Sequence, residues 1–283
     1  MLASLADVLN LFKLAPLDTD TFQGTQPDPP NHHIVGGQIA GQALMAASRT
    51  APERPPHSLN VYFLRRGDAR CPVRFEVARL HDGGNFSTRR VAASQGGQLL
   101  MEAMASFAVD VEGADYQGVM PDVPRPEALV PIELQLAPYA DEFGGWWVSE
   151  RPFDTRYVDP PPRLAMDLDG PPTSVSRIWL RARGTFPADP VINGCMLTYL
   201  SALTLLEAAQ GPMGKSMTDV SALLDHAVWF HRPADFSDWL LFEQKSPTGI
   251  GGRALATGSL FNLDGALVCT ATQEGYFPAP RNN

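Results

Sequence analysis

The sequence contains few cysteines and few basic residues for its length. Its 283 residues include three cysteines, Cys71, Cys195 and Cys269, which are far apart and odd in number. This spacing indicates neither a disulfide framework nor a zinc site, and single buried thiols fit a reducing compartment. Lysine and arginine number 22 against 31 aspartates and glutamates, so the formal net charge is −9. Such an acidic balance argues against a nucleic-acid partner.

Long hydrophobic runs and targeting signals are also lacking. No uninterrupted apolar stretch approaches the roughly 18 residues of a membrane span, so no membrane partner is expected. Residues 1–7 have neither the cationic nor the apolar region of a signal peptide, and residues 281–283 are not a peroxisomal address. Because 44% of the residues are apolar and 19% are charged, we expect a packed soluble core and a cytoplasmic protein.

The chain does contain an internal repeat. Residues 228–232 resemble residues 61–65, at a separation of 167 positions (228 minus 61). The same separation relates Phe242 to Phe75. One strand carried twice indicates one fold built twice, with a site shared between the two copies.

The hydrophobic periodicity predicts the same element order in both copies. The first copy reads as a central helix from Ile39 to Ser48, rich in small residues, followed by strands near 58–64, 73–78, 86–94 and 99–109. A short helix over 4–13, with Ser4 and Asp7 as a capping box, precedes it. The second copy reads as a strand over 175–183, a buried helix over 193–209 and four strands near 223–231, 239–246, 253–262 and 266–275.

Between the copies, the composition changes. Residues 112–172 hold 11 of the 26 prolines, which is typical of a crossing segment. The aromatic residues 143–148 are interpreted as a strand or as a loop that covers a groove. The prediction is therefore an N-terminal unit over 1–112, a proline-rich linker over 113–140 and a C-terminal unit over 141–283.

Several motifs, in order along nearly the whole chain, resemble the acyl-CoA thioesterase II family. They are Gly36-Gly37-Gln38 with Gly41-Gln42-Ala43-Leu44, Tyr62-Phe63-Leu64-Arg65 with Gly67-Asp68, Arg89-Arg90-Val91, Asp225-His226 with Trp229-Phe230-His231-Arg232-Pro233, and Gln273-Glu274-Gly275. The resemblance implies an α+β double hotdog, in which each unit is an antiparallel sheet wrapped around a central helix. It also implies a ligand bound between the two units, and a homodimer or higher homo-oligomer.

The family hydrolyses fatty acyl-CoA to free fatty acid and CoA with activated water, and it uses no metal, no cofactor and no covalent nucleophile. An Asp, a Thr or Ser and a Gln position the water in the family. Carried onto this chain, the Gln is Gln273, the Asp position is Ala202 and the Thr or Ser position is Leu223, with Ser221 close to the latter. Gln273 is thus the predicted catalytic residue, and two of the three polar positions are apolar here.

This replacement leaves three functions open. The first is a thioesterase with weakened activity or with a relocated set of water-binding residues. The second is an acyl-CoA-binding homologue without catalysis, and the third is a related reaction such as dehydration of a 3-hydroxyacyl thioester. The candidates for a relocated set are Ser201 and Thr204 on the helix, Asp225 and His226 on the strand, and Gln38 and Gln42 on the first helix.

Substrate-binding residues are predicted at two places. Gly36, Gly37 and Gln38 begin the first central helix, where backbone N–H groups suit an anion. Arg65, Arg89 and Arg90, with Arg66, suit the phosphates of CoA because paired guanidinium groups bind phosphate well. His231 and Arg232 are interpreted as structural. The pair His32-His33 lacks a carboxylate or cysteine at ligand spacing and does not indicate a metal site.

Overall fold

The structure is a computed structural model, and it describes residues 2–27, 33–51, 53–169, 171–214 and 222–278. The first half contains α1 (Leu5–Leu11), β1 (Ala15–Asp18), β2 (Thr21–Gly24), α2 (Gly36–Ser48), β3 (Pro56–Phe63), β4 (Val73–Asp82), β5 (Phe86–Gln95) and β6 (Gln98–Ala108). The second half contains β7 (Phe153–Tyr157), α4 (Pro162–Ala165), β8 (Val175–Ala182), α5 (Pro190–Thr204), α6 (Glu207–Gln210), β9 (Ala222–Leu223), β10 (Asp225–Phe230), β11 (Leu240–Ile250), β12 (Arg253–Asn262) and β13 (Leu267–Tyr276).

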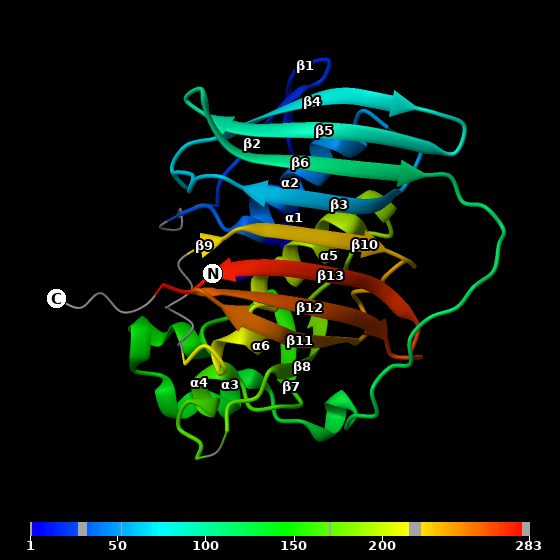
Figure 1. The fold of residues 1–283 in the computed structure, drawn as a ribbon. Helices are drawn as coiled ribbons and strands as arrows, with labels where there is room; N and C mark the ends of the chain where they lie inside the picture. The colour runs from blue at the N-terminus through cyan, green and yellow to red at the C-terminus, as the bar shows by residue number, and fades with distance from the viewer. Residues whose placement is uncertain (1, 28–32, 52, 170, 215–221, 279–283) are drawn as a thin grey trace.

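All of these strands join one antiparallel sheet, which curves around α2 and α5 (Figure 1). Among the described residues the sheet has 13 strands in the order β1-β2-β4-β5-β6-β3-β10-β13-β12-β11-β8-β7, and β9 pairs with β13. The order of the second half is the reverse of that of the first. This mirrored order confirms the predicted repeat and the predicted double hotdog.

The two repeated strands meet at the joint between the halves. Strands β3 and β10 pair antiparallel, and Asn60 lies directly opposite Ala227. These two residues are themselves 167 positions apart (227 minus 60), so an approximate two-fold axis passes through this pair. Two copies of the same strand can pair antiparallel across such an axis, because each copy presents the same edge to the other. The sheet therefore continues from one half into the other.

The central helices pack against each other beneath this joint. Helix α2 is buried on nearly all sides, since most of its side chains are small. A Cβ on Gly37 would lie 2.6 Å from the backbone oxygen of Tyr199 on α5, and a Cβ on Gly41 would lie 3.1 Å from the backbone oxygen of Cys195. Glycine at these positions therefore lets the two helices approach backbone to backbone.

Helix α5 begins and ends for local reasons. Pro190 occupies its first turn, and the carboxylate of Asp189 accepts hydrogen bonds from the N–H groups of Val191 and Ile192 at 2.8 and 3.0 Å. The helix ends at Thr204, so the single helix predicted over 193–209 is interrupted before α6. The stretch Pro190–Gln210 is apolar and long enough to span a membrane, but most of it is buried within the fold, as expected of a core helix.

The connection between the halves runs along one side of the sheet (Figure 1). It is tied down by an ion pair between Asp115 and Arg232 and by a 2.8 Å bond from Gln117 Nε2 to the carbonyl of Gly265. Short helical turns follow, namely η1 (Pro126–Ala128), α3 (Ile132–Gln135), η2 (Ala137–Tyr139) and η3 (Glu142–Val148). The aromatic segment is therefore not a strand, and it covers a cavity beside α5.

Candidate active site

The N-terminal end of α2 faces a pocket at the joint between the halves. No side chain caps this helix end, and the N–H groups of Gln38 and Ile39 already bond the carbonyl of Val35. The N–H groups of Gly36 and Gly37 make no hydrogen bond to any described residue. Two donors at the positive end of a helix dipole are thus available to a carbonyl oxygen or an anion.

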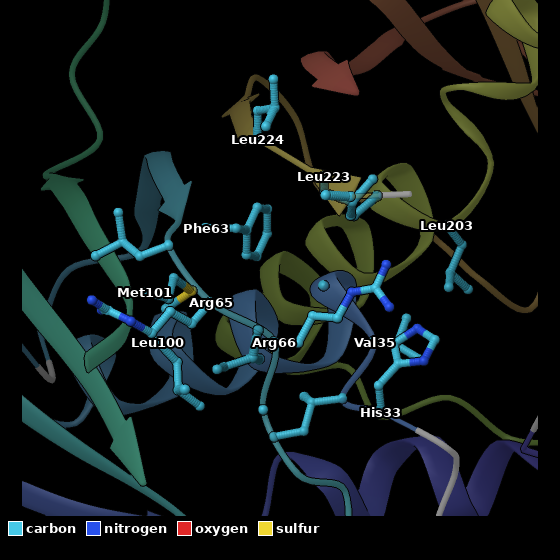
Figure 2. Close-up of a pocket in the computed structure, with 17 residues that line it drawn as sticks. His33, Val35, Phe63, Arg65, Arg66, Leu100, Met101, Leu203, Leu223 and Leu224 are labelled. Carbon is cyan, nitrogen blue, oxygen red and sulfur yellow. The ribbon is translucent and has the colours of Figure 1, made fainter. Parts of the chain in front are cut away.

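The pocket has a volume of about 450 Å³ and is mostly apolar (Figure 2). Arg65 and Arg66 are exposed at its rim, where cationic groups would meet the phosphates of a large ligand. Arg65 also donates a 3.0 Å hydrogen bond to the carbonyl of Leu99. The lining residues are His33, Ile34, Val35, Gly36, Ile39, Phe63, Leu64, Arg65, Arg66, Gly67, Leu100, Met101, Ala202, Leu203, Ala222, Leu223 and Leu224.

Both apolar replacements predicted from the sequence line this pocket. Leu223 presses on the end of α2, because a Cβ on Gly36 would lie only 2.5 Å from its Cδ1 atom. Ala202 lies on the other side, with its Cβ 3.2 Å from the place a Cβ on Gly37 would take. The two donors of α2 are therefore flanked by hydrocarbon, and neither flanking residue can hold a water molecule.

A buried polar cluster lies deeper, between the sheet and α5. Ala227 pairs with Thr272, so the next positions, His226 and Gln273, are neighbours on the face toward α5. Both side chains are fully buried, and neither amide atom of Gln273 has a hydrogen-bond partner among the described residues. His226 Nε2 lies 3.0 Å from the hydroxyl of Ser201. Buried unpaired polar atoms are costly, so the amide of Gln273 is suited to bind a small polar molecule such as water.

The charge state of this cluster follows from its burial. Burial lowers the pKa of His226 to about 4, and the backbone at Thr272 opposes the shift only in part. His226 is therefore neutral at neutral pH. Its Nε2 atom bonds Ser201, and its buried Nδ1 atom has no hydrogen-bond partner among the described residues. Burial raises the pKa of Asp225, whose carboxylate accepts the N–H of Glu274 at 2.9 Å and so connects β10 to β13.

The other residues considered for a relocated water site have local partners. Gln42 donates to the carbonyls of Leu11 and Thr25 at 3.0 and 2.9 Å, which ties α2 to the N-terminal segment. The amide of Gln38 donates to the side chain of Gln26 at 2.7 Å. Thr204, which does not line this pocket, accepts a 3.1 Å hydrogen bond from Gln244. Ser221 and His32 lie outside the described residues.

Two of the predicted phosphate ligands, Arg89 and Arg90, do not line this pocket. Arg89 is 2% exposed, and its guanidinium donates to Thr50 and forms a 2.7 Å ion pair with Asp82. Its guanidinium is buried and paired inside the first half, so it cannot turn outward to a ligand without losing its bonds to Thr50 and Asp82. Arg90 lies on the sheet surface, 3.7 Å from Glu102. Neither residue lines the pocket.

A second cavity of about 520 Å³ adjoins the pocket on the other side of Leu203. It lies beneath η3, and its lining includes Arg151, Tyr157 and Glu207, which were not predicted from the sequence. The hydroxyl of Tyr157 donates to Glu207 at 2.8 Å. The only sequence signal for this site is the lone acidic residue Glu207 at the end of an otherwise apolar helical stretch.

Comparison with known proteins agrees with this architecture. A sequence model described as acyl-CoA thioesterase matches residues 148–276, and one described as acyl-CoA thioesterase N-terminal domain matches residues 26–108. Acyl-CoA thioesterase 2 of Haemophilus influenzae is 34% identical, over 96% of this chain and 98% of the relative. Acyl-coenzyme A thioesterase 8 of Homo sapiens is also 34% identical, over 95% of this chain and 88% of the relative.

Solved structures give the same result. The tesB protein of Mycobacterium avium subspecies paratuberculosis is 42% identical with a TM-score of 0.81, over 98% of this chain and all of that one. Acyl-CoA thioesterase II TesB2 of Mycobacterium marinum is 37% identical with a TM-score of 0.80, over the same shares. The two halves, the shared pocket and these full-length matches together place the chain in the acyl-CoA thioesterase family.

Proposed function

We propose that the chain binds a fatty acyl-CoA in the pocket between its halves and hydrolyses the thioester to free fatty acid and CoA. The observation that carries the proposal is the pocket itself, in which the two unbonded N–H groups of α2 meet an apolar wall and a cationic rim. The thioester carbonyl would lie at Gly36 and Gly37, and the phosphates at Arg65 and Arg66. Helix donors of this kind stabilise the oxyanion that forms when water attacks a carbonyl.

The water-activating part of the site is reduced in this chain. We assign Gln273 the role of orienting a water molecule, because its amide is buried and unpaired. No carboxylate stands at Ala202 to remove a proton, and general-base catalysis typically contributes about 10²- to 10⁴-fold. We therefore expect hydrolysis with a low kcat, carried by positioning and oxyanion stabilisation alone.

A second function is favoured by the same two positions. Ala202 and Leu223 line the pocket with hydrocarbon while the cationic rim is retained, which suits acyl-CoA binding without hydrolysis. Steady-state hydrolysis of acyl-CoAs of several chain lengths, followed with a thiol probe and compared with equilibrium binding, separates the two functions. Hydrolysis above the uncatalysed background supports the enzyme. Saturable binding with hydrolysis at background for every chain length supports the binding protein.

The remaining assignments accompany this proposal. We take the functional halves to be residues 1–112 and 141–283, joined by residues 113–140, because the pocket needs α2 from one half and Ala202 and Leu223 from the other. We also expect a cytoplasmic protein and a homodimer or higher oligomer. Size-exclusion chromatography with light scattering measures the second expectation, and a monomer at all concentrations would contradict it.

A further inference from the structure

The second cavity holds two groups of opposite charge that do not form an ion pair with each other. Glu207 and Arg151 both line it, yet no ion pair between them occurs among the described residues. Each charge is close enough to act on the other, since the guanidinium of Arg151 helps to hold down the pKa of Glu207. The space between a buried anion and a buried cation suits a group that donates to one and accepts from the other.

The carboxyl of Glu207 is anchored on one side only. The hydroxyl of Tyr157 donates to its Oε2 atom at 2.8 Å and fixes its orientation. No other side chain among the described residues forms a hydrogen bond with this carboxyl, and burial raises the pKa of Glu207 to about 7, against the lowering effects of Tyr157 and Arg151. A buried carboxyl with one hydrogen bond is stabilised by a further polar partner.

Arg151 has a hydrogen-bond donor that lacks an acceptor in the described part of the chain. Its Nη2 atom donates to the carbonyl of Trp147 at 2.9 Å, and its guanidinium lies 5.4 Å from the ring centre of Trp146. Its Nε atom is buried and has no hydrogen-bond partner among the described residues. Burial also lowers the pKa of Arg151. This donor is therefore held inside the fold and is available to an acceptor.

The cavity is placed to receive a chain that begins in the pocket. The two spaces share His33, Val35 and Leu203 in their walls. From that shared wall, one face of α5 and α6 lines the cavity through Tyr199, Leu200, Leu203 and Thr204 to Glu207. From 199 to 207 there are eight helical steps, which cover roughly 12 Å. An acyl chain whose thioester lies at Gly36 could therefore extend along this face toward Glu207.

We propose that the second cavity binds the distal part of the acyl chain and selects a chain that carries a hydroxyl group at its far end. The inference deepens the proposed function and rests on acyl-CoA binding in the adjoining pocket. The hydroxyl donates to the carboxylate of Glu207 and accepts from Nε of Arg151. The substrate class is thus an ω-hydroxyacyl-CoA.

The other end groups fit less well. A methyl group would offer no partner to Nε of Arg151 or to the second oxygen of Glu207, and a buried polar group left unpaired costs about 1–3 kcal/mol. A carboxylate would meet the carboxylate of Glu207, and an ammonium group would meet Arg151. A hydroxyl is neutral and combines one donor with an acceptor, so it satisfies both groups without adding charge.

The test uses non-hydrolysable thioethers, so that it does not depend on turnover. Two series of S-alkyl-CoA analogues of increasing length, one ending in methyl and one in hydroxyl, are titrated calorimetrically into the intact protein at about pH 8, where Glu207, whose pKa is raised to about 7, is mostly in its carboxylate form. We expect the two series to bind alike while short. At the length that reaches Glu207, the hydroxylated analogue should bind about tenfold more tightly, as expected for one net hydrogen bond to a charged group.

Matched variants locate the preference. Glu207→Leu should abolish the tenfold preference and raise the affinity for the methyl series, whereas Glu207→Gln, which keeps an acceptor, should retain part of it. Tyr157→Phe, which only releases the carboxyl, should reduce it. The exposed Glu127→Gln serves as the control and should leave both series unchanged. Thermal unfolding and binding of the shortest analogue show that each variant is folded.

Two results would overturn the inference, and they differ. If both series bind but the methyl analogue is equal or better at every length, the cavity holds only water or a plain chain, and acyl-CoA binding stands without the selectivity. If neither series binds, the proposed function fails and this inference fails with it.

Discussion

Restoring a carboxylate at position 202 is the sharpest test of how this site is built. The Ala202 Cβ lies 3.2 Å from the place of a Cβ on Gly37, so a longer side chain at 202 points at the N-terminal end of α2. In Ala202→Asp the new carboxylate would lie beside the unbonded N–H groups of Gly36 and Gly37 and could remove a proton from an attacking water. We expect kcat to rise about 100-fold, at the low end of general-base effects.

The same substitution should cost stability. Ala202 is 6% exposed, so the carboxylate loses most of its hydration. An isolated buried charge costs several kcal/mol, and a partly buried helix N-terminus returns up to about 2 kcal/mol. We therefore expect the free energy of unfolding to fall by about 2 kcal/mol, measured by urea unfolding monitored through tryptophan fluorescence.

The control is Ala202→Asn, which has nearly the same shape but cannot act as a base. Hydrolysis is measured with a thiol probe over the chain lengths that bind, and binding of a non-hydrolysable thioether checks that the pocket is intact. If Asp and Asn variants are folded, bind equally and hydrolyse at the same rate, position 202 is not where the base is missing. Adding Leu223→Thr to the Asp variant should raise kcat again, because it frees the end of α2 and supplies a hydroxyl for the water.

Other substitutions test the remaining parts of the argument. Gln273→Ala should lower any measurable kcat at least tenfold with little change in thioether affinity, and an unchanged kcat would remove this residue from the mechanism. Replacing Arg65 and Arg66 together by alanine should weaken CoA binding at low salt more than at high salt, whereas a salt-independent effect would contradict a phosphate-binding role. Gly37→Ala should destabilise the fold by about 1–3 kcal/mol, because its Cβ would meet the backbone of α5 at 2.6 Å; an unchanged midpoint of urea unfolding would refute that contact. Because the folded pKa of Glu207 is raised to about 7, protonation favours the folded state, and stability should rise as pH falls from about 7 to about 4.5, by up to about 3 kcal/mol. Urea unfolding of Glu207→Gln across that window should lack this rise, and an identical pH profile in both proteins would count against it.

Much of the fold could be predicted from residue order alone. Alternation of buried and exposed positions in β4, β5 and β12 defines half-buried strands, and small residues define a central helix that a sheet can approach closely. Helix α1 begins at the capping box of Ser4 and Asp7, as predicted. These features are local, since they depend on residues a few positions apart. The break between α5 and α6 was missed because apolar periodicity continues across it.

The sequence by itself determined that the chain is one hotdog built twice, and which polar positions of the family's site are apolar here. Only the tertiary structure decided that Leu223 packs against Gly36, that Arg89 forms an ion pair with Asp82, and that Glu207 lines a cavity. Each of these contacts joins segments that are distant along the chain. Residue type sets what a side chain can do, but the desolvation and the partners that fix its charge and its availability arise only when the two halves pack together.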